Sequence, residues 1–309
     1  MIKEDFYFLS NDGKTTLHGI KWIPEEKEVR GILQIIHGMT EYIDRYDEFA
    51  TFMCSKGYLV VGHDHLGHGD SIQSVNDYGY FAAKHPGTVL IKDIHDVRLM
   101  VSSEYRDKKY FMLGHSMGSY LLRRYLSSRG NGLSGVVIVG TGYVNKAACN
   151  TGIVICKKLA QKHGGHYVSK KLEAVIFSGD YWRFDMTGKD LTRNFTTKDI
   201  DILLARKDDP KSGFTFTVNG FYTLISTVLF SERKSNIRRI PKDLPIFLIA
   251  GDQDPVGGMG KGVRKVYNIY QKMGLNVGIK MYEGFRHEVL NEINREEVYA
   301  DVLSWIEGE

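Results

Sequence analysis

The stretch Gly114-His115-Ser116-Met117-Gly118 decides the fold, because it is a G-x-S-x-G pentapeptide between two segments of different pattern. The apolar run 109–113 is typical of a buried strand, and the run 119–129 is typical of a helix. A sharp strand-to-helix turn exposes a serine hydroxyl and points a helix N-terminus at it. Side chains two residues before and after the serine would collide with neighbouring strands, so glycine is expected at both positions. We therefore expect Ser116 to be a nucleophile held in a strained backbone conformation.

A serine nucleophile also needs a histidine base and a carboxylate that orients the histidine. The strand-like run 244–250 leads into Gly251-Asp252-Gln253-Asp254-Pro255-Val256, and the run 277–282 leads into a loop that contains His287. The chain order serine, aspartate, histidine is that of an α/β-hydrolase. Each segment also has an alternative explanation when it is taken singly. The pentapeptide could occur by chance, the two aspartates could be ordinary turn residues, and His287 could be the N-terminal residue of a helix. Three strand ends in the right order favour the catalytic interpretation.

A fourth segment, His37-Gly38-Met39-Thr40-Glu41, follows the strand-like run 29–36. In α/β-hydrolases a loop after an early strand, often one that begins His-Gly, supplies one amide for the oxyanion. By position this donor is the backbone amide of Met39, which would pair with the amide of Met117. The alternative for this segment is a simple turn.

The chain resembles the α/β-hydrolase superfamily, in particular the branch of monoacylglycerol lipases, lysophospholipase-like esterases and serine aminopeptidase-type sequences. The matching residues span nearly the whole chain in the order of the family: 37–41 with Arg45-Tyr46, then 64–71, 114–118, 251–256 and 285–288. One departure is Met39, where members of the family often have a small residue.

The resemblance implies a catalytic triad of Ser116, Asp254 and His287, with the amides of Met39 and Met117 as oxyanion donors. It implies no cofactor and no metal. It assigns the acid to Asp254, while Asp252, directly at the strand end, would brace the loop through local hydrogen bonds. A metal site is the alternative for the cluster His63, Asp64, His65, His68 and Asp70, which the resemblance explains as a structural loop.

Strand and helix patterns alternate along the chain, which predicts a mostly parallel central sheet flanked by helices. The runs 5–9 and 16–23 predict an opening antiparallel pair, and the runs 87–105 and 295–307 have helical spacing. Further strands are expected near Ile32, Leu59, Phe111, Val136, Phe247 and Ile279. The site should lie at the carboxyl edge of this sheet.

The interval between Val139 and Leu244 is too long for one crossover helix and holds several loosely helical groups. We interpret residues 143–235 as an inserted helical cap, which the resemblance also implies. The cap would divide the hydrolase core into a first part, 1–142, and a second part, 236–309. A separate binding domain is the weaker alternative, because the insertion begins and ends at sheet strands.

Charge, cysteine content and hydropathy bear on which partners and which cellular compartment are expected. The net charge of +4 gives little support for nucleic-acid binding, so basic pairs such as Lys157-Lys158 are interpreted as solvated faces. Three cysteines make no disulfide framework and suit a reducing compartment. Because no run has the length of a signal core or a membrane span, we expect a soluble, cytoplasmic protein. The sequence makes no prediction of the oligomeric state.

The expected activity is two-step hydrolysis of a carboxylic ester: a monoacylglycerol, a lysophospholipid or a short-to-medium-chain acyl ester. The apolar residues of the cap favour a lipid substrate and transient contact of the cap with a membrane surface. The alternative is a proline iminopeptidase-like peptidase, which needs cap carboxylates such as Glu173, Asp180 or Asp185 to hold an amino terminus. The peptidase loop of the family reads His-Gly-Gly-Pro-Gly, unlike residues 37–41. A member that only binds its ligand is the third hypothesis.

Overall fold

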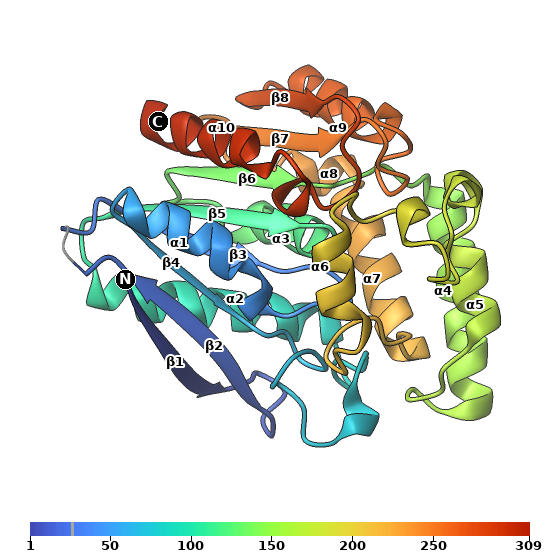
Figure 1. The fold of residues 1–309 in the computed structure, drawn as a ribbon. Helices are drawn as coiled ribbons and strands as arrows, with labels where there is room; N and C mark the ends of the chain where they lie inside the picture. The colour runs from blue at the N-terminus through green and yellow to red at the C-terminus, as the bar shows by residue number, and fades with distance from the viewer. Residues whose placement is uncertain (26–27) are drawn as a thin grey trace.

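The computed structural model of the protein describes residues 1–25 and 28–309. Within that range the chain forms an eight-stranded sheet of order β1-β2-β4-β3-β5-β6-β7-β8 (Figure 1). The strands are β1 (Ile2–Leu9), β2 (Thr16–Ile23), β3 (Gly31–Ile36), β4 (Tyr58–His63), β5 (Lys109–His115), β6 (Gly135–Val139), β7 (Ile246–Gly251) and β8 (Val277–Tyr282). The strands from β3 to β8 are parallel, and β2 is antiparallel to both β1 and β4. The mostly parallel sheet and the opening antiparallel pair are confirmed.

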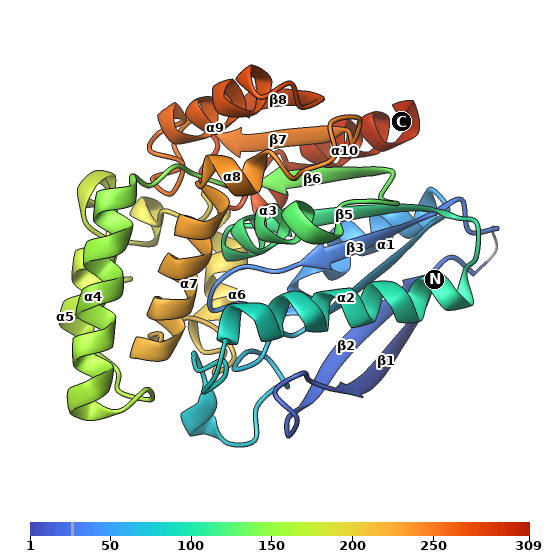
Figure 2. The ribbon, with the colours of Figure 1, turned by 180° about the vertical axis from the view of Figure 1, so that it is seen from behind.

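Helices cover both faces of the sheet, so the inner strands are buried on both sides and read as continuous apolar runs. On β3, Leu33 and Ile35 belong to the core on the face of α1 and α10, whereas Ile32 and Ile36 belong to the core on the face of α2, α3 and α9 (Figures 1 and 2). The bounds of these helices are α1 (Asp47–Ser55), α2 (Pro86–Glu104), α3 (Met117–Arg129), α9 (Lys261–Lys272) and α10 (Arg295–Gly308).

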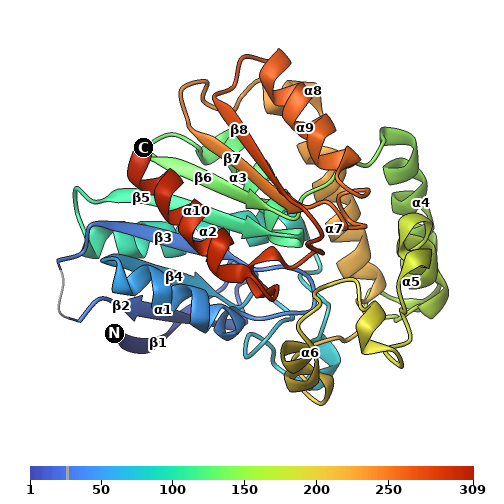
Figure 3. The same ribbon diagram turned by 45° about the horizontal axis from the view of Figure 1, so that its top comes forward.

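Between β6 and β7 the chain forms a separate block of helices beyond the carboxyl ends of the strands (Figure 3). Its helices are α4 (Lys146–His163), α5 (Lys170–Ile176), α6 (Ile200–Lys207) and α7 (Val218–Ser231). The short helix α8 (Lys234–Ile237) follows α7 and contacts α3 of the core. Polar side chains cap the N-termini of the first four: Asn145, Ser169, Asp199 and Thr217. We refer to this block as the cap; its predicted limits at residues 143 and 235 remain a prediction.

No helix in the described part of the chain combines the length and the apolar character needed to cross a bilayer.

Candidate active site

Ser116 lies on the turn from β5 to α3, where its backbone has φ 53° and ψ −118°. Such a conformation is strained for a residue with a side chain and persists only where the surroundings enforce it. A Cβ at Gly118 would lie 1.9 Å from the carbonyl oxygen of Ile36, and one at Gly114 would lie 2.6 Å from the carbonyl oxygen of Gly118. The backbones therefore approach too closely for any residue but glycine on either side of the serine.

Three strand ends bring Ser116, His287 and Asp254 together. The Nε2 atom of His287 lies 2.8 Å from Ser116 Oγ, and its Nδ1 atom lies 3.0 Å from Asp254 Oδ2. The second contact is within ion-pair distance but is not aligned as a hydrogen bond, which is common for catalytic contacts in free enzymes. Asp254 is fully buried, and its Oδ1 accepts a hydrogen bond of 2.8 Å from the amide of Val256.

Two opposing effects act on the His287 ring. Burial lowers its pKa, but the charge of Asp254 and the contact with that carboxylate raise it more. The net result is a pKa above the ordinary value of 6.5. The surroundings therefore stabilise the imidazolium that forms when the ring takes a proton from a hydroxyl.

Asp252 makes a different contact from Asp254. Its Oδ1 atom accepts a hydrogen bond of 2.8 Å from the amide of Gly284, which joins the turn after β7 to the turn after β8. Asp252 thus braces the turn through a residue 32 positions away, whereas the sequence predicted local hydrogen bonds. The geometry thus places Asp254, and not Asp252, beside the histidine.

The loop after β3 runs alongside the serine turn. A Cβ at Gly38 would lie 3.0 Å from the Cβ of Ser116. Among residues 1–25 and 28–309, no backbone oxygen accepts a hydrogen bond from the amide of Met39 or of Met117. Met117 is the first residue of α3, so its amide also lies at the positive end of that helix. Both predicted donors are therefore free to bind an oxyanion.

Residues 27–294 match the family model described as serine aminopeptidase, S33. The chain belongs to this family. Mouse monoglyceride lipase is 29% identical over 287 residues, which are 90% of this chain and 82% of the relative. The monoacylglycerol lipase of Mycolicibacterium smegmatis is 25% identical over 292 residues, 92% of this chain and 90% of the relative.

Among solved structures, a highly thermostable carboxyl esterase from Bacillus coagulans, in complex with glycerol, is 30% identical with a TM-score of 0.90. The superposition covers 100% of this chain and 99% of the esterase. These comparisons confirm the predicted superfamily, fold and enzyme class. The chain is an esterase-like and monoacylglycerol lipase-like α/β-hydrolase.

In this S33 hydrolase, Glu41 holds the loop after β3 in place. Its Oε1 accepts hydrogen bonds from the amide of Gly38, from Tyr46 Oη at 2.9 Å and from His115 Nδ1 at 2.9 Å. Its Oε2 accepts from Arg45 at 2.9 Å. Burial alone would raise the pKa of Glu41, but His115 and Arg45 lower it to about 2. A charged, fully bonded Glu41 therefore fixes the loop that carries Met39.

The same network continues into the cap. Arg45 also donates to Glu288 Oε2 at 2.8 Å, and Arg206 of α6 donates to Glu288 Oε1 at 2.6 Å. Because Glu288 directly follows His287, the ion pair between Arg206 and Glu288 links α6 to the loop that contains His287. The family resemblance contains Glu41, Arg45 and Glu288 but assigned them no role, and Arg206 had no signal in the sequence.

A cap segment also lies directly against the histidine loop. The amides of His287 and Glu288 donate to the carbonyl oxygens of Phe195 and Thr196, at 3.3 Å and 2.7 Å. The Phe195 ring lies 6.0 Å from the His287 ring and 5.2 Å from the ring of Tyr181. Phe195, an aromatic side chain of the cap that itself packs on Tyr181, therefore lies over the His287 ring.

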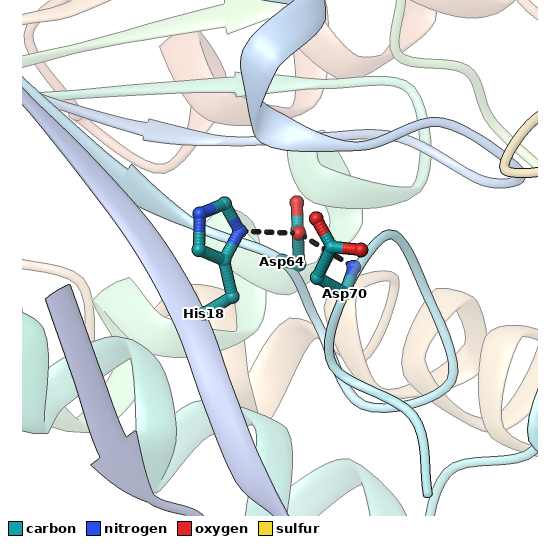
Figure 4. A group of neighbouring side chains, drawn as sticks. All are labelled: His18, Asp64 and Asp70. Atoms are coloured by element: carbon teal, nitrogen blue, oxygen red, sulfur yellow. Dashed lines mark hydrogen bonds and ion pairs between the residues drawn. The ribbon is translucent and has the colours of Figure 1, made fainter. Parts of the chain in front are cut away.

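One group in the described residues could bring three metal-ligand atoms within 4.8 Å of one another: His18, Asp64 and Asp70 (Figure 4). His18 lies 2.8 Å from Asp64 and 2.8 Å from Asp5 through its two ring nitrogens. Burial lowers the pKa of His18, but the two carboxylates raise it to about 9. The ring is therefore protonated at neutral pH and offers two donors, not a lone pair for a metal. Asp64 also accepts hydrogen bonds from the amides of Ile43 and Asp70, which fix the loop.

The histidines singled out in the sequence form a different, apolar cluster. The ring of His65 packs against the tilted ring of His37, with centroids 4.2 Å apart, and edge-on against the ring of His63, with centroids 5.0 Å apart. The ring nitrogens of His63 and His65 have no hydrogen-bond partner in the described part of the chain. Burial, and after it the charge of His37, lowers the pKa of His63 and of His68 to about 3. These rings are neutral core side chains.

We expect this cluster to make the protein sensitive to acid. Unfolded histidine binds a proton near pH 6.5, whereas folded His63 stays neutral down to about pH 3. Below pH 6.5 the unfolded state therefore binds more protons, and stability falls as the pH drops towards 3. At about pH 5 the free energy of unfolding should be lower by about 2 kcal/mol for each such histidine than it is near neutrality. Urea unfolding near neutrality and at about pH 5 measures it.

His63→Phe should flatten this pH dependence, because it removes one group that must be protonated on unfolding. His163→Phe is the matched control, since His163 is exposed. The same dependence in both variants would contradict the assignment.

Proposed function

We propose that the protein hydrolyses carboxylic esters, namely monoacylglycerols, lysophospholipids or short-to-medium-chain acyl esters, through Ser116, His287 and Asp254. Ser116 Oγ attacks the carbonyl carbon while His287 Nε2 takes the hydroxyl proton. The amides of Met39 and Met117 donate to the oxyanion, and His287 then protonates the departing alcohol. Water, with His287 again as base, releases the acid from the acyl-enzyme.

One observation carries this proposal: the 2.8 Å approach of His287 Nε2 to Ser116 Oγ on a strained turn. A hydroxyl beside a histidine whose other nitrogen faces a buried carboxylate is the arrangement that activates serine. The esterase and monoacylglycerol lipase names of its relatives support an ester substrate. The three free, buried cysteines support the expected cytoplasmic location, which fractionation of the source cells would test.

The peptidase alternative has less support from the cap carboxylates. Asp185 already accepts hydrogen bonds from the amide and hydroxyl of Thr187 and from the amide of Asp190, within its own turn. Glu173 accepts from the hydroxyl of Thr215. A screen of monoacylglycerols, lysophosphatidylcholine, nitrophenyl esters and prolyl amides, with Ser116→Ala as blank, tests the proposal. Cleavage of prolyl amides and not esters would contradict it.

Acyl preference should follow burial against the apolar cap. Each methylene removed from water contributes about 0.8 kcal/mol. Octanoate should therefore exceed butyrate in kcat/KM by on the order of 100-fold, which is about 3 kcal/mol for four methylenes. A series of nitrophenyl esters from acetate to octanoate measures this. A steep fall after butyrate would indicate a blocked pocket and a small-ester substrate.

We also propose transient contact of the cap with a membrane surface. Large apolar side chains are exposed on it: Val154, Ile155, Val175, Trp182, Met186, Ile200 and Leu204. Trp182 is 76% exposed, and its Ala variant should bind vesicles about tenfold more weakly. Val75→Ala is the matched control, because the Val75 side chain is also 76% exposed but lies outside the cap. Vesicle cosedimentation measures the difference, and equal binding of both variants and the unmodified protein would contradict the proposal.

A further inference from the structure

A cavity of about 430 Å³ lies away from Ser116, between the N-terminal end of α2 and helices α3, α4 and α7. Figure 2 shows that end of α2 beside α7, with α4 on the outer side of α7. Three side chains with a permanent positive charge line the cavity: Arg124, Lys157 and Arg233. No aspartate or glutamate is among its lining residues. The lining of the cavity therefore carries a net positive charge that no lining carboxylate offsets.

Arg124, on α3, is the most buried of these cations; Lys157 and Arg233 are exposed at the rim. Its guanidinium donates to Thr88 Oγ1 at 3.3 Å and stacks on Phe230, 4.8 Å from the ring centroid. No carboxylate in the described residues forms an ion pair with it. Burial lowers the pKa of Arg124, because no negative charge offsets its desolvation.

Arg124 also faces the positive end of a helix. A Cβ at Gly87 would lie 2.3 Å from Arg124 Nη1, so the guanidinium rests against the first turn of the 19-residue helix α2. His85, the N-cap of α2, makes no capping hydrogen bond through its side chain. A helix N-terminus carries about half a positive charge. A cation against it is repelled unless an anion beside them contacts both.

Two hydroxyl groups at this place have no hydrogen-bond partner in the described chain. Ser226 Oγ belongs to a residue that lines the cavity, and Thr227 Oγ1 would lie 3.4 Å from a Cβ at Gly87. Thr227 is only 1% exposed. Buried hydroxyl groups are normally bonded, so two unpaired ones beside a half-buried cation indicate a missing acceptor.

We propose that this cavity binds a phosphate group, either inorganic phosphate or a phosphate monoester. The Arg124 guanidinium has the planar donor geometry that suits phosphate oxygens. The N-terminus of α2 adds favourable charge and the amide of Gly87, since Pro86 has no N–H and the amides of Thr88 and Val89 donate to the carbonyl oxygen of His85. Lys157 also lines an adjoining, more apolar cavity of about 310 Å³ with Cys156 and Ala160, which gives space for an organic substituent. Along α3, Arg124 is about 12 Å from Ser116, so the site is separate from the ester site.

Titration calorimetry with inorganic phosphate, at constant ionic strength in chloride buffer, tests the site directly. We expect saturable binding to the unmodified protein and to Ser116→Ala, which separates this test from that of the esterase. Arg124→Met keeps an apolar stem on Phe230 but removes the donors, and should bind at least about tenfold more weakly. Arg238→Met, an exposed arginine outside the cavity, is the control that should not change binding.

Thermal unfolding provides a second readout. Phosphate should raise the Tm of the unmodified protein and of Arg238→Met, and raise that of Arg124→Met much less. In phosphate-free buffer Arg124→Met should melt no lower than the unmodified protein, because it removes a repulsion. If Arg124→Met fails to fold, the rim variant Lys157→Met/Arg233→Met takes its place and should bind phosphate several-fold more weakly.

Glycerol 3-phosphate and phosphatidylcholine vesicles with or without phosphatidic acid identify the source of the phosphate. Stronger binding to phosphatidic acid vesicles, lost in Arg124→Met, would assign a lipid headgroup. Binding of soluble phosphate without that preference would assign a soluble phosphate ester. No saturable binding of any probe, or equal binding by Arg124→Met and the unmodified protein, would overturn the proposal.

Discussion

Replacing Ser116 with alanine should reduce kcat for ester hydrolysis by roughly 10⁴ to 10⁶. The variant lacks the oxygen that lies 2.8 Å from His287 Nε2, so no acyl-enzyme can form. The residual rate would come from the oxyanion donors and substrate binding alone. Steady-state kinetics with a nitrophenyl ester measure the loss.

Ser127→Ala, on the same helix, is a control for the fold and should retain activity. Circular dichroism and thermal unfolding should show both variants folded. If Ser116→Ala kept more than about one hundredth of the activity, another group would have to be the nucleophile.

Asp254→Asn should reduce kcat by about 10⁴ while leaving the fold intact. Asparagine keeps the shape of the aspartate but cannot fix the tautomer of His287 or stabilise its charged form. Asp252→Asn is the matched comparison two residues away, and it should cost far less activity, because Asp252 contacts Gly284 and not the histidine. The reverse order of effects would transfer the catalytic role to Asp252.

The pH profile separates a catalytic effect from a structural one. His287 must be neutral to act as base, so kcat/KM should rise as the pH passes upward through its pKa, which lies above 6.5. In Asp254→Asn the charge that raises this pKa is gone, and the acidic limb should move to lower pH. A limb that stays in place would contradict the assigned pairing.

The sheet and the positions of the candidate catalytic side chains could be predicted because both depend on local patterns. Parallel strands buried on both faces read as short apolar runs, and even the partly exposed edge strand β8 (Val277–Tyr282) has the predicted bounds. Since all parallel strands end at one edge, the residues after β3, β5, β7 and β8 had to meet there. Chain order and spacing therefore indicated Ser116, His287 and the turn with Asp252 and Asp254, and the family resemblance indicated Asp254 within that turn.

The ion-pair network and the basic cavity could not be predicted in this way. Arg206 reaches Glu288 across 82 positions of sequence, and the contact depends on how α6 lies against the core. Lys157 is exposed, as its place in a basic pair suggested, yet its position near Arg124 depends on the packing of α7 against both α3 and α4. Neither contact follows from the periodicity of one helix.

Identification of the residue that reacts with a fluorophosphonate shows whether Ser116 is the nucleophile. The probe forms a covalent bond with an activated serine, and peptide mass spectrometry locates the adduct. We predict one adduct per chain, on the Ser116 hydroxyl, and none in Ser116→Ala. An adduct on another residue, or undiminished labelling of Ser116→Ala, would contradict the account.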